Sequence, residues 1–455
     1  MSSQNFEKQL LINPSGFPDM PPKYAIALRW MLDVIRKNYE LSGFSPIETP
    51  LVERVEVLTA KAGAEIKTQI YGLRLMNPGE GADDSKDVGL RFDQTVPLAR
   101  FVAANQQNLL FPFRRYVIGP VFRGETPKNG RYRQFIQADI DAIGDGSLHI
   151  LHDAEIVGVI ARVFNELNIG SFTIRIGHRK VLQGLLRSVG VNDDVIKAAS
   201  NSIDKLEKIG RVRVIELLAK LGITEDNSEK LLTILTDTRS VDEVLASLRS
   251  FSFNEEYCEG IQELEQVIAG VRALGVSEDS FKVDISIARG LDYYTGTVYE
   301  TRFNKYPDLG SIASGGRYEN LASTYTDKNY PGVGISIGVT RLLLRLIEAG
   351  LVNADKSTVA PVIVMTSAGL EKSANNCNQF AKVLRDAGIG TEVYLADRNL
   401  GKQMNFANKR GFSVAVIVRE DNLTSNTVAV RNLGTGEQVD VPVNDMLKEV
   451  QKFLS

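Results

Sequence analysis

The stretch RGLDYYTGTVYE, residues 289–300, brings a guanidinium, a carboxylate and two adjacent tyrosines together. Neighbouring side chains of a β-strand point to opposite faces, so Tyr293 and Tyr294 cannot both pack in one core. Burying Arg289 would require a partner that repays the loss of its hydration. The stretch is consistent with the wall of a binding site. It is also consistent with a hairpin edge where aromatic side chains pair across strands and the arginine is solvated.

A second group of reactive side chains lies in residues 113–144, which predict a long hairpin with its turn at TPKNG. One face of the second arm is mostly apolar and is expected in the core; it comprises Tyr132, Gln134, Ile136, Ala138 and Ile140. The opposite face carries Arg133, Phe135, Gln137, Asp139 and Asp141, and the first arm adds Arg115 and Arg123. Such a row of charges is costly to bury unless something pairs with it. The hairpin therefore predicts either a site for a polyanionic or zwitterionic ligand or an internal ion-pair network.

The segment LRFDQTVPLARFVA predicts a strand that runs into a helix near Pro97, because proline suits the first turn of a helix. Asp93 and Thr95 lie two residues apart and are expected on one face of that strand. A carboxylate beside a hydroxyl would suit an ammonium group, so this pair predicts the binding of a cationic group.

Some common chemistries are disfavoured by what the sequence lacks. No G-x-x-x-x-G-K-[ST] phosphate loop is present. The glycines of GVGISIG, residues 332–338, lie within a strand pattern instead of at a strand-to-helix turn, which argues against a dinucleotide fold. The two cysteines and three histidines lack metal-ligand spacing, so a Cys/His metal site is not expected.

Length and composition indicate a globular protein of several domains. The 455 residues suffice for roughly two to four domains. The chain has no long apolar stretch and no secretory pattern, so we expect a cytoplasmic protein without a membrane partner. Because the net charge is only −3, a polyanion would have to bind at local basic patches.

Two such patches occur. Residues 111–137 contain one acid, Glu125, among six basic residues, and residues 398–410 contain Arg398, Lys402, Lys409 and Arg410 without an acid. Basic runs are most often solvated surface, so each patch is open to that interpretation as well as to phosphate binding.

The pattern along the chain predicts an interrupted first domain and a separate last one. Short helices with polar faces are predicted over 177–278, as an insertion between residues 1–176 and 279–352. Within the second part, SGGRY predicts a Gly-Gly turn. After the polar linker VNADKSTVAP, strands and helices alternate over 359–455, which predicts an α/β domain with a largely parallel sheet.

Five segments, in order, resemble the signature series of the class II histidyl-tRNA synthetases. They are FSPIETP, LRFDQTVP, PVFRGETPKNGRYRQFIQAD, ARGLDYYTGTVYE with SGGRY, and GISIGVTRLL. The first, third and fifth are similar to the three class II motifs, and the other two are similar to histidine-specific elements. The likeness spans residues from about 20 to 455. It implies an α+β fold in which an antiparallel sheet is flanked by helices, with a helical insertion and a C-terminal α/β anticodon-binding domain.

The resemblance also implies the reaction and its partners. A histidine–tRNA ligase uses ATP with Mg²⁺ to convert histidine to histidyl-adenylate, and then transfers the histidyl group to the 3′ end of tRNA(His). A homodimer is expected, with FSPIETP at the dimer contact, because its prolines favour an edge or interface strand.

Site residues are implied at matching positions. Arg289 and Arg123 would be the catalytic residues over the reacting carboxylate and the α-phosphate, and Arg123 with Arg341 would bind ATP. The expected histidine-binding residues are Asp93, Thr95 and Gln137 at the ammonium, Asp141 and Tyr294 at the imidazole, and Tyr293 in the pocket wall.

The sequence departs from the family pattern at two places. Thr340 stands before Arg341, where the family usually has an acidic residue, so the metal ligands stay unknown. SGFPDMPP stands where many members have Gly-Thr-Arg-Asp, which puts the dimer edge in doubt. The alternative function is a synthetase-like regulatory or tRNA-sensing paralogue without ligase activity, although Arg289, both tyrosines and the C-terminal domain argue against it.

Overall fold

The computed structural model describes residues 11–60, 64–76, 87–127, 130–237, 239–287, 294–320 and 322–455. Arg289 and Tyr293 lie outside the described residues. Contacts divide the chain into two compact units. The first is Met31–Leu351 with the described residues before Asp19, and the second is Val352–Ser455 with Asp19–Trp30.

The first unit is built on an eight-stranded sheet with the order β1-β5-β6-β11-β10-β9-β7-β8. The strands are β1 (Ser45–Pro46), β5 (Phe113–Phe122), β6 (Gln134–Ile143), β7 (Phe172–His178), β8 (Phe281–Val283), β9 (Thr297–Phe303), β10 (Ala313–Tyr318) and β11 (Gly332–Gly338). Neighbours from β5 to β7 are antiparallel, whereas the short edge strands β1 and β8 pair in parallel. The antiparallel sheet expected from the sequence is confirmed, with β1, from the FSPIETP segment, at one edge.

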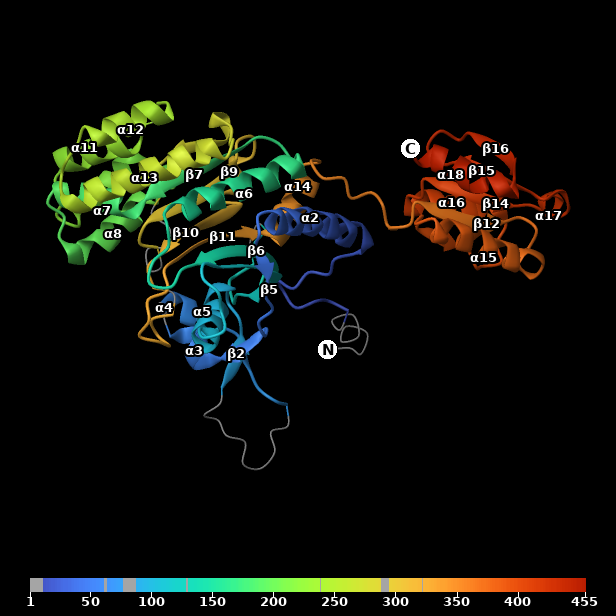
Figure 1. Cartoon of the computed structure of the whole chain (residues 1–455), viewed down its shortest axis with the longest axis horizontal. Helices are drawn as coiled ribbons and strands as arrows, with labels where there is room; N and C mark the ends of the chain where they lie inside the picture. Colours follow the sequence, from blue (N-terminus) through green and yellow to red (C-terminus); the bar gives the residue numbers. More distant parts are fainter. Residues whose placement is uncertain are drawn as a thin grey trace, which may run out of the picture. The chain divides into compact units, whose positions relative to one another are not determined.

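One face of this sheet is apolar because alternate residues of its central strands are small or aliphatic. Ala138, Ile140 and Ala142 of β6 are fully buried. Helices α6 (Leu151–Leu167) and α14 (Val339–Glu348) lie along this side of the sheet, together with the part of α2 (Pro22–Leu41) from Met31 onward (Figure 1). The Tyr39 hydroxyl of α2 donates a hydrogen bond to the Ala138 carbonyl at 3.1 Å. Of the set predicted for the core face of the second hairpin arm, Ala138 and Ile140 are in the core, whereas Tyr132 and Ile136 are half-buried and Gln134 is exposed.

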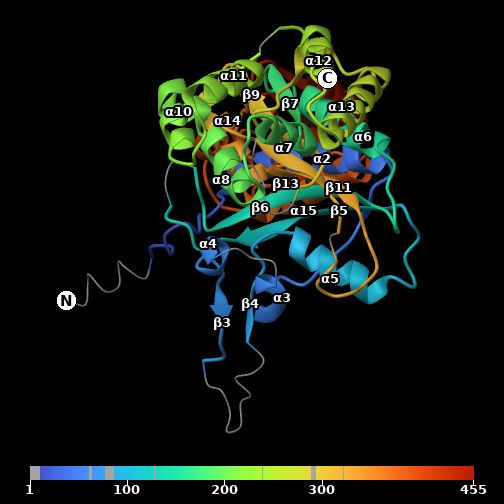
Figure 2. The same cartoon turned by 90° about the vertical axis from the view of Figure 1, so that its left-hand side faces the viewer.

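The other face meets a smaller layer. It comprises α3 (Val55–Thr59), α5 (Thr95–Asn105) and a three-stranded sheet of β2 (Val52–Arg54), β4 (Val88–Leu90) and β3 (Gly72–Leu73), in the order β2-β4-β3. Figures 1 and 2 both show α3 and α5 on the side away from α6. The chain between β4 and α5 therefore approaches the polar face of β6.

Helices occupy the chain between β7 and β8. They are α7 (Arg179–Ser188), α8 (Asp193–Ile203), α9 (Leu206–Ile209), α10 (Arg211–Ala219), α11 (Glu225–Leu235), α12 (Val241–Arg249) and α13 (Glu255–Ala273). Ser240 and Glu243 form a reciprocal capping box at the start of α12, which satisfies backbone N–H groups that the helix leaves free. Helix α13 packs against α6 and α7 and ties this helical segment to the sheet.

The second unit has a five-stranded sheet with the order β13-β12-β14-β15-β16. Its elements are β12 (Val362–Thr366), α15 (Leu370–Asp386), β13 (Thr391–Val393), α16 (Leu400–Arg410), β14 (Val414–Val418), α17 (Glu420–Ser425), β15 (Thr427–Asn432), β16 (Gln438–Pro442) and α18 (Met446–Leu454). Strands β13, β12 and β14 are parallel, whereas β15 and β16 add an antiparallel hairpin. The largely parallel sheet predicted from the sequence holds only for the first three strands.

Three local predictions in the first unit were wrong. The Gly-Gly pair of SGGRY lies inside β10 instead of forming a turn. Asp93 and Thr95 do not share a strand, because β4 ends at Leu90 and Thr95 begins α5. Tyr294 precedes β9, which begins at Thr297, so it does not lie on a strand as expected from the alternation in residues 289–300. Among the described residues, no helix has the length and apolar character needed to cross a membrane.

Candidate active site

Two adjoining cavities lie on the polar face of the eight-stranded sheet. The acidic cavity, about 190 Å³, is lined by Asp93, Thr95, Arg123, Gln137, Asp139, Asp141, Tyr294, Ser314, Tyr318, Gly334, Ile335 and Ser336. The arginine cavity, about 320 Å³, includes Arg123, Glu125, Arg131, Gln137, Ser314, Ser336, Arg341 and Arg345 in its wall. Arg123, Gln137, Ser314 and Ser336 line both cavities, so the two spaces meet there.

Glycines in neighbouring strands leave room for the side chains of the acidic cavity. A Cβ on Gly334 would lie 2.1 Å from Asp141 Oδ1. A Cβ on Gly316 would lie 2.8 Å from Cγ of Tyr294. Both positions therefore require glycine, and Gly316 of β10 provides space for the Tyr294 ring.

Asp141 is held by two groups of the protein. Its Oδ2 lies 2.6 Å from Nη2 of the fully buried Arg115, the residue opposite it on β5. Its Oδ1 accepts a hydrogen bond from the Tyr318 hydroxyl at 3.0 Å. Burial raises the pKa of Asp141 to about 6, although Arg115 and Tyr318 favour its charged form. The ion-pair interpretation of the hairpin is thus correct for Asp141 and Arg115.

Asp139 lies two residues before Asp141 on the same face of β6 and is only 4% exposed. Its Oδ1 has no hydrogen-bond partner among the described residues. Burial raises the pKa of Asp139 to about 7, while Arg115 and the Ser336 hydroxyl oppose this shift. The hairpin face therefore also contains a carboxylate that the protein does not fully satisfy.

Asp93 and Gln137 place further acceptors around the same cavity. Asp93 Oδ1 accepts hydrogen bonds from the backbone N–H groups of Thr95 and Val96, at 3.1 and 2.9 Å, at the start of α5. Burial raises the pKa of Asp93, and these two N–H groups and Arg123 oppose the rise. Gln137 Nε2 donates to Ser336 Oγ at 2.6 Å, which leaves Gln137 Oε1 without a partner among the described residues. An unsatisfied acceptor beside a carboxylate suits an ammonium group.

Arg123 stands where the two cavities meet. Its Nε donates to the Phe92 carbonyl at 3.2 Å, and its guanidinium lies over the rings of Phe92 and Phe135, at 4.5 and 5.2 Å from their centroids. Burial lowers the pKa of Arg123, whereas nearby carboxylates, Asp93 first among them, favour its charged form. The aromatic contacts fix the orientation of a cation that can reach an anion shared by both cavities.

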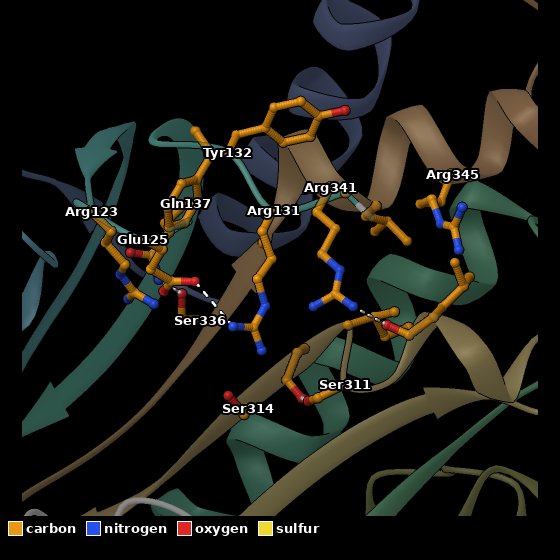
Figure 3. Close-up of a pocket in the computed structure, with 17 residues that line it drawn as sticks. Arg123, Glu125, Arg131, Tyr132, Gln137, Ser311, Ser314, Ser336, Arg341 and Arg345 are labelled. Carbon is orange, nitrogen blue, oxygen red and sulfur yellow. Dashed lines mark hydrogen bonds and ion pairs between the residues drawn. The ribbon is translucent and has the colours of Figure 1, made fainter. Parts of the chain in front are cut away.

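The arginine cavity gathers further cations. Arg341 of α14 donates from Nη2 to the Leu309 carbonyl at 2.8 Å, and Arg131 Nη1 lies 3.3 Å from Glu125 Oε2. Figure 3 shows the guanidinium groups of Arg131 and Arg341 beside each other, across from Ser311 and Ser314. Arg345 pairs with Asp308 and Glu348 at 3.1 and 2.9 Å. Guanidinium groups from the hairpin and from α14 thus converge on a space suited to a phosphate chain.

The Thr340 hydroxyl takes part in a structural hydrogen bond. It is 2% exposed, and its Oγ1 accepts a hydrogen bond from the Ile136 N–H of β6 at 2.9 Å. The hydroxyl therefore joins α14 to the sheet. Among the described residues, no group of three or more His, Cys, Asp and Glu side chains could hold a metal ion.

The structure brings six of the nine expected site residues to one cavity. Asp93, Thr95, Arg123, Gln137, Asp141 and Tyr294 all line the acidic cavity, and Arg341 lines the arginine cavity. Arg289 and Tyr293 cannot be placed, because they lie outside the described residues.

Further cavity residues were not assigned from the sequence: Asp139, Ser314, Tyr318 and Ser336. The alternation of the hairpin put Asp139 on the polar face, which was a usable signal. Ser336 lies in a G-x-S-x-G string, but it is inside β11 and not at a sharp turn after a strand, so the nucleophile-elbow motif does not apply. Only the pairing of β6 with β11, and of β11 with β10, shows that Ser336 and Ser314 belong here.

Comparisons with known proteins agree with this architecture. The family model for histidyl-tRNA synthetase matches residues 16–342, and the model for the anticodon binding domain matches residues 360–453. The chain is 44% identical to the histidine–tRNA ligase of Nostoc punctiforme, over 97% of this chain and 98% of that protein. It is 41% identical to the histidine–tRNA ligase of Clostridium tetani, over 98% and 99%.

The fold is similar to that of solved structures. The crystal structure of histidyl-tRNA synthetase from Nostoc sp. PCC 7120 matches with a TM-score of 0.89 and 42% identity, over 97% of this chain and 99% of that one. The family expected from the sequence is confirmed. The chain belongs to the histidyl-tRNA synthetase family of class II aminoacyl-tRNA synthetases.

Proposed function

We propose how the two cavities carry out the histidine–tRNA ligase reaction. The chain is a class II aminoacyl-tRNA synthetase that uses ATP to activate histidine and then esterifies tRNA. The observation that carries the proposal is the junction at Arg123, where an acidic cavity meets a cavity lined by arginines. Histidine, which carries an ammonium and an imidazole, matches the first cavity, and the polyphosphate of ATP matches the second.

Histidine would lie across β6 with its ammonium near Asp93, Thr95 and Gln137. Asp93 and the unpaired Gln137 Oε1 are acceptors that an ammonium can satisfy. The imidazole would lie toward Asp141 and Tyr294, at the other end of the cavity. This orientation directs the carboxylate of histidine to the junction, where Arg123 stands.

The first step joins two anions, so stabilisation of charge supplies most of the catalysis. A carboxylate oxygen of histidine attacks the α-phosphorus of ATP, the bond to the pyrophosphate oxygen breaks, and no proton has to move. Arg123 would hold the α-phosphate and Arg341 the γ-phosphate. We assign Arg289 to the reacting carboxylate and Tyr293 to the pocket wall from the sequence motif alone. Fixed guanidinium groups at these points stabilise the charge that spreads over phosphate in the transition state.

Mg²⁺ would bind together with ATP. Protein sites for nucleotide-bound Mg²⁺ commonly supply one or two carboxylates, with phosphates and water completing the octahedron. The described wall of the arginine cavity contains one carboxylate, Glu125, while the Thr340 hydroxyl is already engaged with the sheet. This donor set fits a metal that the nucleotide carries and that Glu125 helps to hold. When bound, the ion would screen the charge of the departing pyrophosphate.

The remaining assignments concern the larger organisation. We propose a catalytic domain formed by residues 1–176 and 279–352, a helical insertion at 177–278, and an anticodon-binding domain at 359–455 that reads tRNA(His). We also propose a cytoplasmic homodimer. The support for the dimer is that β1 is an edge strand of two residues that pairs on one side with β5, and that Pro46 and Pro50 cannot donate ladder hydrogen bonds.

The alternative of a regulatory paralogue without ligase activity receives no support from the relatives, because those compared over nearly the whole chain are named as histidine–tRNA ligases. A structure titled as an ATP phosphoribosyltransferase regulatory subunit/histidyl-tRNA synthetase from Bacillus halodurans matches with a TM-score of 0.73 but only 20% identity, which shows the fold alone.

Charging of a tRNA(His) transcript with labelled histidine by the purified full-length chain tests the proposal. We expect an ester-linked product that depends on ATP and histidine. A tRNA of another specificity, at the same concentration, is the control. A protein that forms histidyl-adenylate but charges neither tRNA would contradict the ligase assignment and favour the regulatory alternative.

A further inference from the structure

We propose that Asp139 is a specificity-determining residue of the histidine pocket, which accepts a hydrogen bond from the imidazole of bound histidine through the carboxylate oxygen that the protein leaves unpaired. The inference rests on the proposed function, because it takes histidine as the ligand of the acidic cavity. It adds a second carboxylate to the imidazole end of that cavity, beside Asp141.

The position of Asp139 follows from the register of three strands. On β6, Gln137, Asp139 and Asp141 occupy alternate positions and therefore point to the same face. Ser336 of β11 lies opposite Asp139 on one side, and Val117 of β5 lies opposite on the other. Asp139 is thus held at the middle of the cavity floor, between the acceptors proposed for the ammonium and the carboxylate proposed for the imidazole.

The hydrogen bonds of the two aspartates differ. One carboxylate oxygen of Asp141 forms an ion pair with Arg115 Nη2, and the other accepts a hydrogen bond from the Tyr318 hydroxyl. Among the described residues, no cation forms an ion pair with Asp139, and its Oδ1 is buried without a donor. A carboxylate that is 4% exposed and unsatisfied is costly, and a ligand donor removes that cost. A ring N–H of imidazole is such a donor.

The surroundings of Asp139 also disfavour a purely structural role. Arg115, the nearest cation on the neighbouring strand, is directed to Asp141 at 2.6 Å. Ser336 Oγ accepts a hydrogen bond from Gln137 Nε2 at 2.6 Å, and its own hydroxyl gives Asp139 a neutral hydrogen bond instead of a charged partner. Among the described residues the protein thus provides Asp139 with no ion pair, and Asp139 lines the acidic cavity.

Two substitutions test the role of the charge and of the acceptor. Asp139→Ala should raise the KM for histidine in ATP–pyrophosphate exchange by about 10-fold or more, while changing the KM for ATP less than about twofold. Asp139→Asn, which keeps the shape, should give a smaller increase in the same direction. Glu300→Gln is the matched control: Glu300 is a buried carboxylate on the same sheet face, three strands away, and pairs with Arg175.

The end of histidine that contacts Asp139 can be identified with imidazolepropionate, which has the ring and the carboxylate but no ammonium. If Asp139 contacts the ring, the inhibition constant of imidazolepropionate should rise in Asp139→Ala by the same factor as the KM for histidine. Asp93→Ala should show the opposite pattern, with weaker histidine binding but unchanged inhibition. Unchanged inhibition in both Asp139 variants would overturn the proposal, because the carboxylate would then contact only the ammonium.

The remaining outcomes separate the inference from the proposed function. A wild-type protein without histidine-dependent exchange means that the function itself is wrong. A wild-type protein with normal exchange, together with Asp139 variants of unchanged histidine KM, means that only the inference is wrong. A lower melting temperature with unchanged KM in Asp139→Asn likewise overturns the inference and assigns Asp139 to the stability of the sheet.

Discussion

Strands β6 and β14 lie inside the sheets of the two units, and they differ in the kinds of side chain that they bury. All five residues of β14, VAVIV, are buried and apolar, so both faces of the strand pack against hydrocarbon. On β6, apolar Ala138 and Ile140 alternate with Asp139 and Asp141, although all four are buried. A strand in the middle of a sheet therefore has no need of carboxylates. Because burying carboxylates is costly, the polar face of β6 indicates a ligand surface.

The largest effect is expected where the two cavities meet. Arg123→Lys keeps the positive charge but loses the planar fork and its contact with two aromatic rings, so the kcat for adenylate formation should fall by about 100-fold or more. ATP–pyrophosphate exchange measures this step. Arg114→Lys is the control, because Arg114 lies on β5, the strand that leads to Arg123, but pairs with Glu155 outside both cavities. Equal losses in the two variants would mean that this arm of the hairpin is merely sensitive to substitution.

Substitution of a glycine in the floor of the acidic cavity tests whether this cavity holds histidine. Gly334→Ala would place a Cβ 2.1 Å from Asp141 Oδ1 and displace that carboxylate. The KM for histidine should rise by about 10-fold, the loss expected for one buried hydrogen bond. Gly338→Ala, whose Cβ meets no atom within 4 Å, should leave the histidine KM within about twofold. If the Gly334 variant binds histidine normally, Asp141 does not contact the ligand.

Substitutions in the second unit should change only the reaction that involves tRNA. Lys402 and Lys409 are exposed and lie one heptad apart on α16, whereas Arg410 pairs with Glu392 at 3.3 Å. Changing both lysines to alanine should raise the KM for tRNA a few-fold and flatten its salt dependence by roughly one logarithmic unit for each lost phosphate contact. Histidine-dependent exchange, which needs no tRNA, should not change. Unchanged charging at low and high salt would identify the patch as solvated surface.

The smallest expected effect is proton release when histidine binds. Burial raises the pKa of Asp139 to about 7 and that of Asp141 to about 6, so both are partly protonated near pH 6–7 in the free protein. A donor from the ligand favours the charged form and lowers the pKa, which releases a fraction of a proton. Above about pH 8 the release should vanish, because both groups are already ionised.

Calorimetry of histidine binding in buffers with different ionisation enthalpies measures this release. The charged or titratable groups near Asp139 are Arg115 from β5, Asp141 from β6, Asp93 before α5, Tyr39 from α2, Arg91 after β4, Arg123 after β5 and Tyr294 before β9. Asp139→Asn should reduce the release while leaving the proton change of the imidazole itself. An identical release in the variant would show that Asp139 does not titrate on binding.

The sequence predicted elements whose pattern is local. Alternation along β6 separated the core face from the polar face, and the prolines of FSPIETP predicted an edge strand, as found for β1. Predictions were wrong where the structure depends on a neighbouring strand. Gly315 and Gly316 suggested a turn, yet a Cβ on Gly315 would lie 2.0 Å from the Gly334 carbonyl of the neighbouring strand. No window of sequence contains that contact.

The site residues also divide into those that sequence motifs predicted and those that depend on contacts between strands. Family motifs named Asp93, Gln137, Asp141 and Tyr294, which the fold brings to one cavity. The sequence did not show that Arg115 neutralises Asp141 while Asp139 keeps an unpaired oxygen, because that difference depends on side-chain distances across β5 and β6.

The most direct test of the central claim is ATP–pyrophosphate exchange by the wild-type protein across a panel of amino acids. If the polar face of β6 is a histidine pocket, histidine should support exchange, and isosteres that lack a ring N–H should be disfavoured by about 100-fold or more in kcat/KM. Phenylalanine and glutamine, which match part of the size or polarity of histidine, are the informative competitors. Equal exchange with several amino acids, or exchange with one other than histidine, would contradict the account.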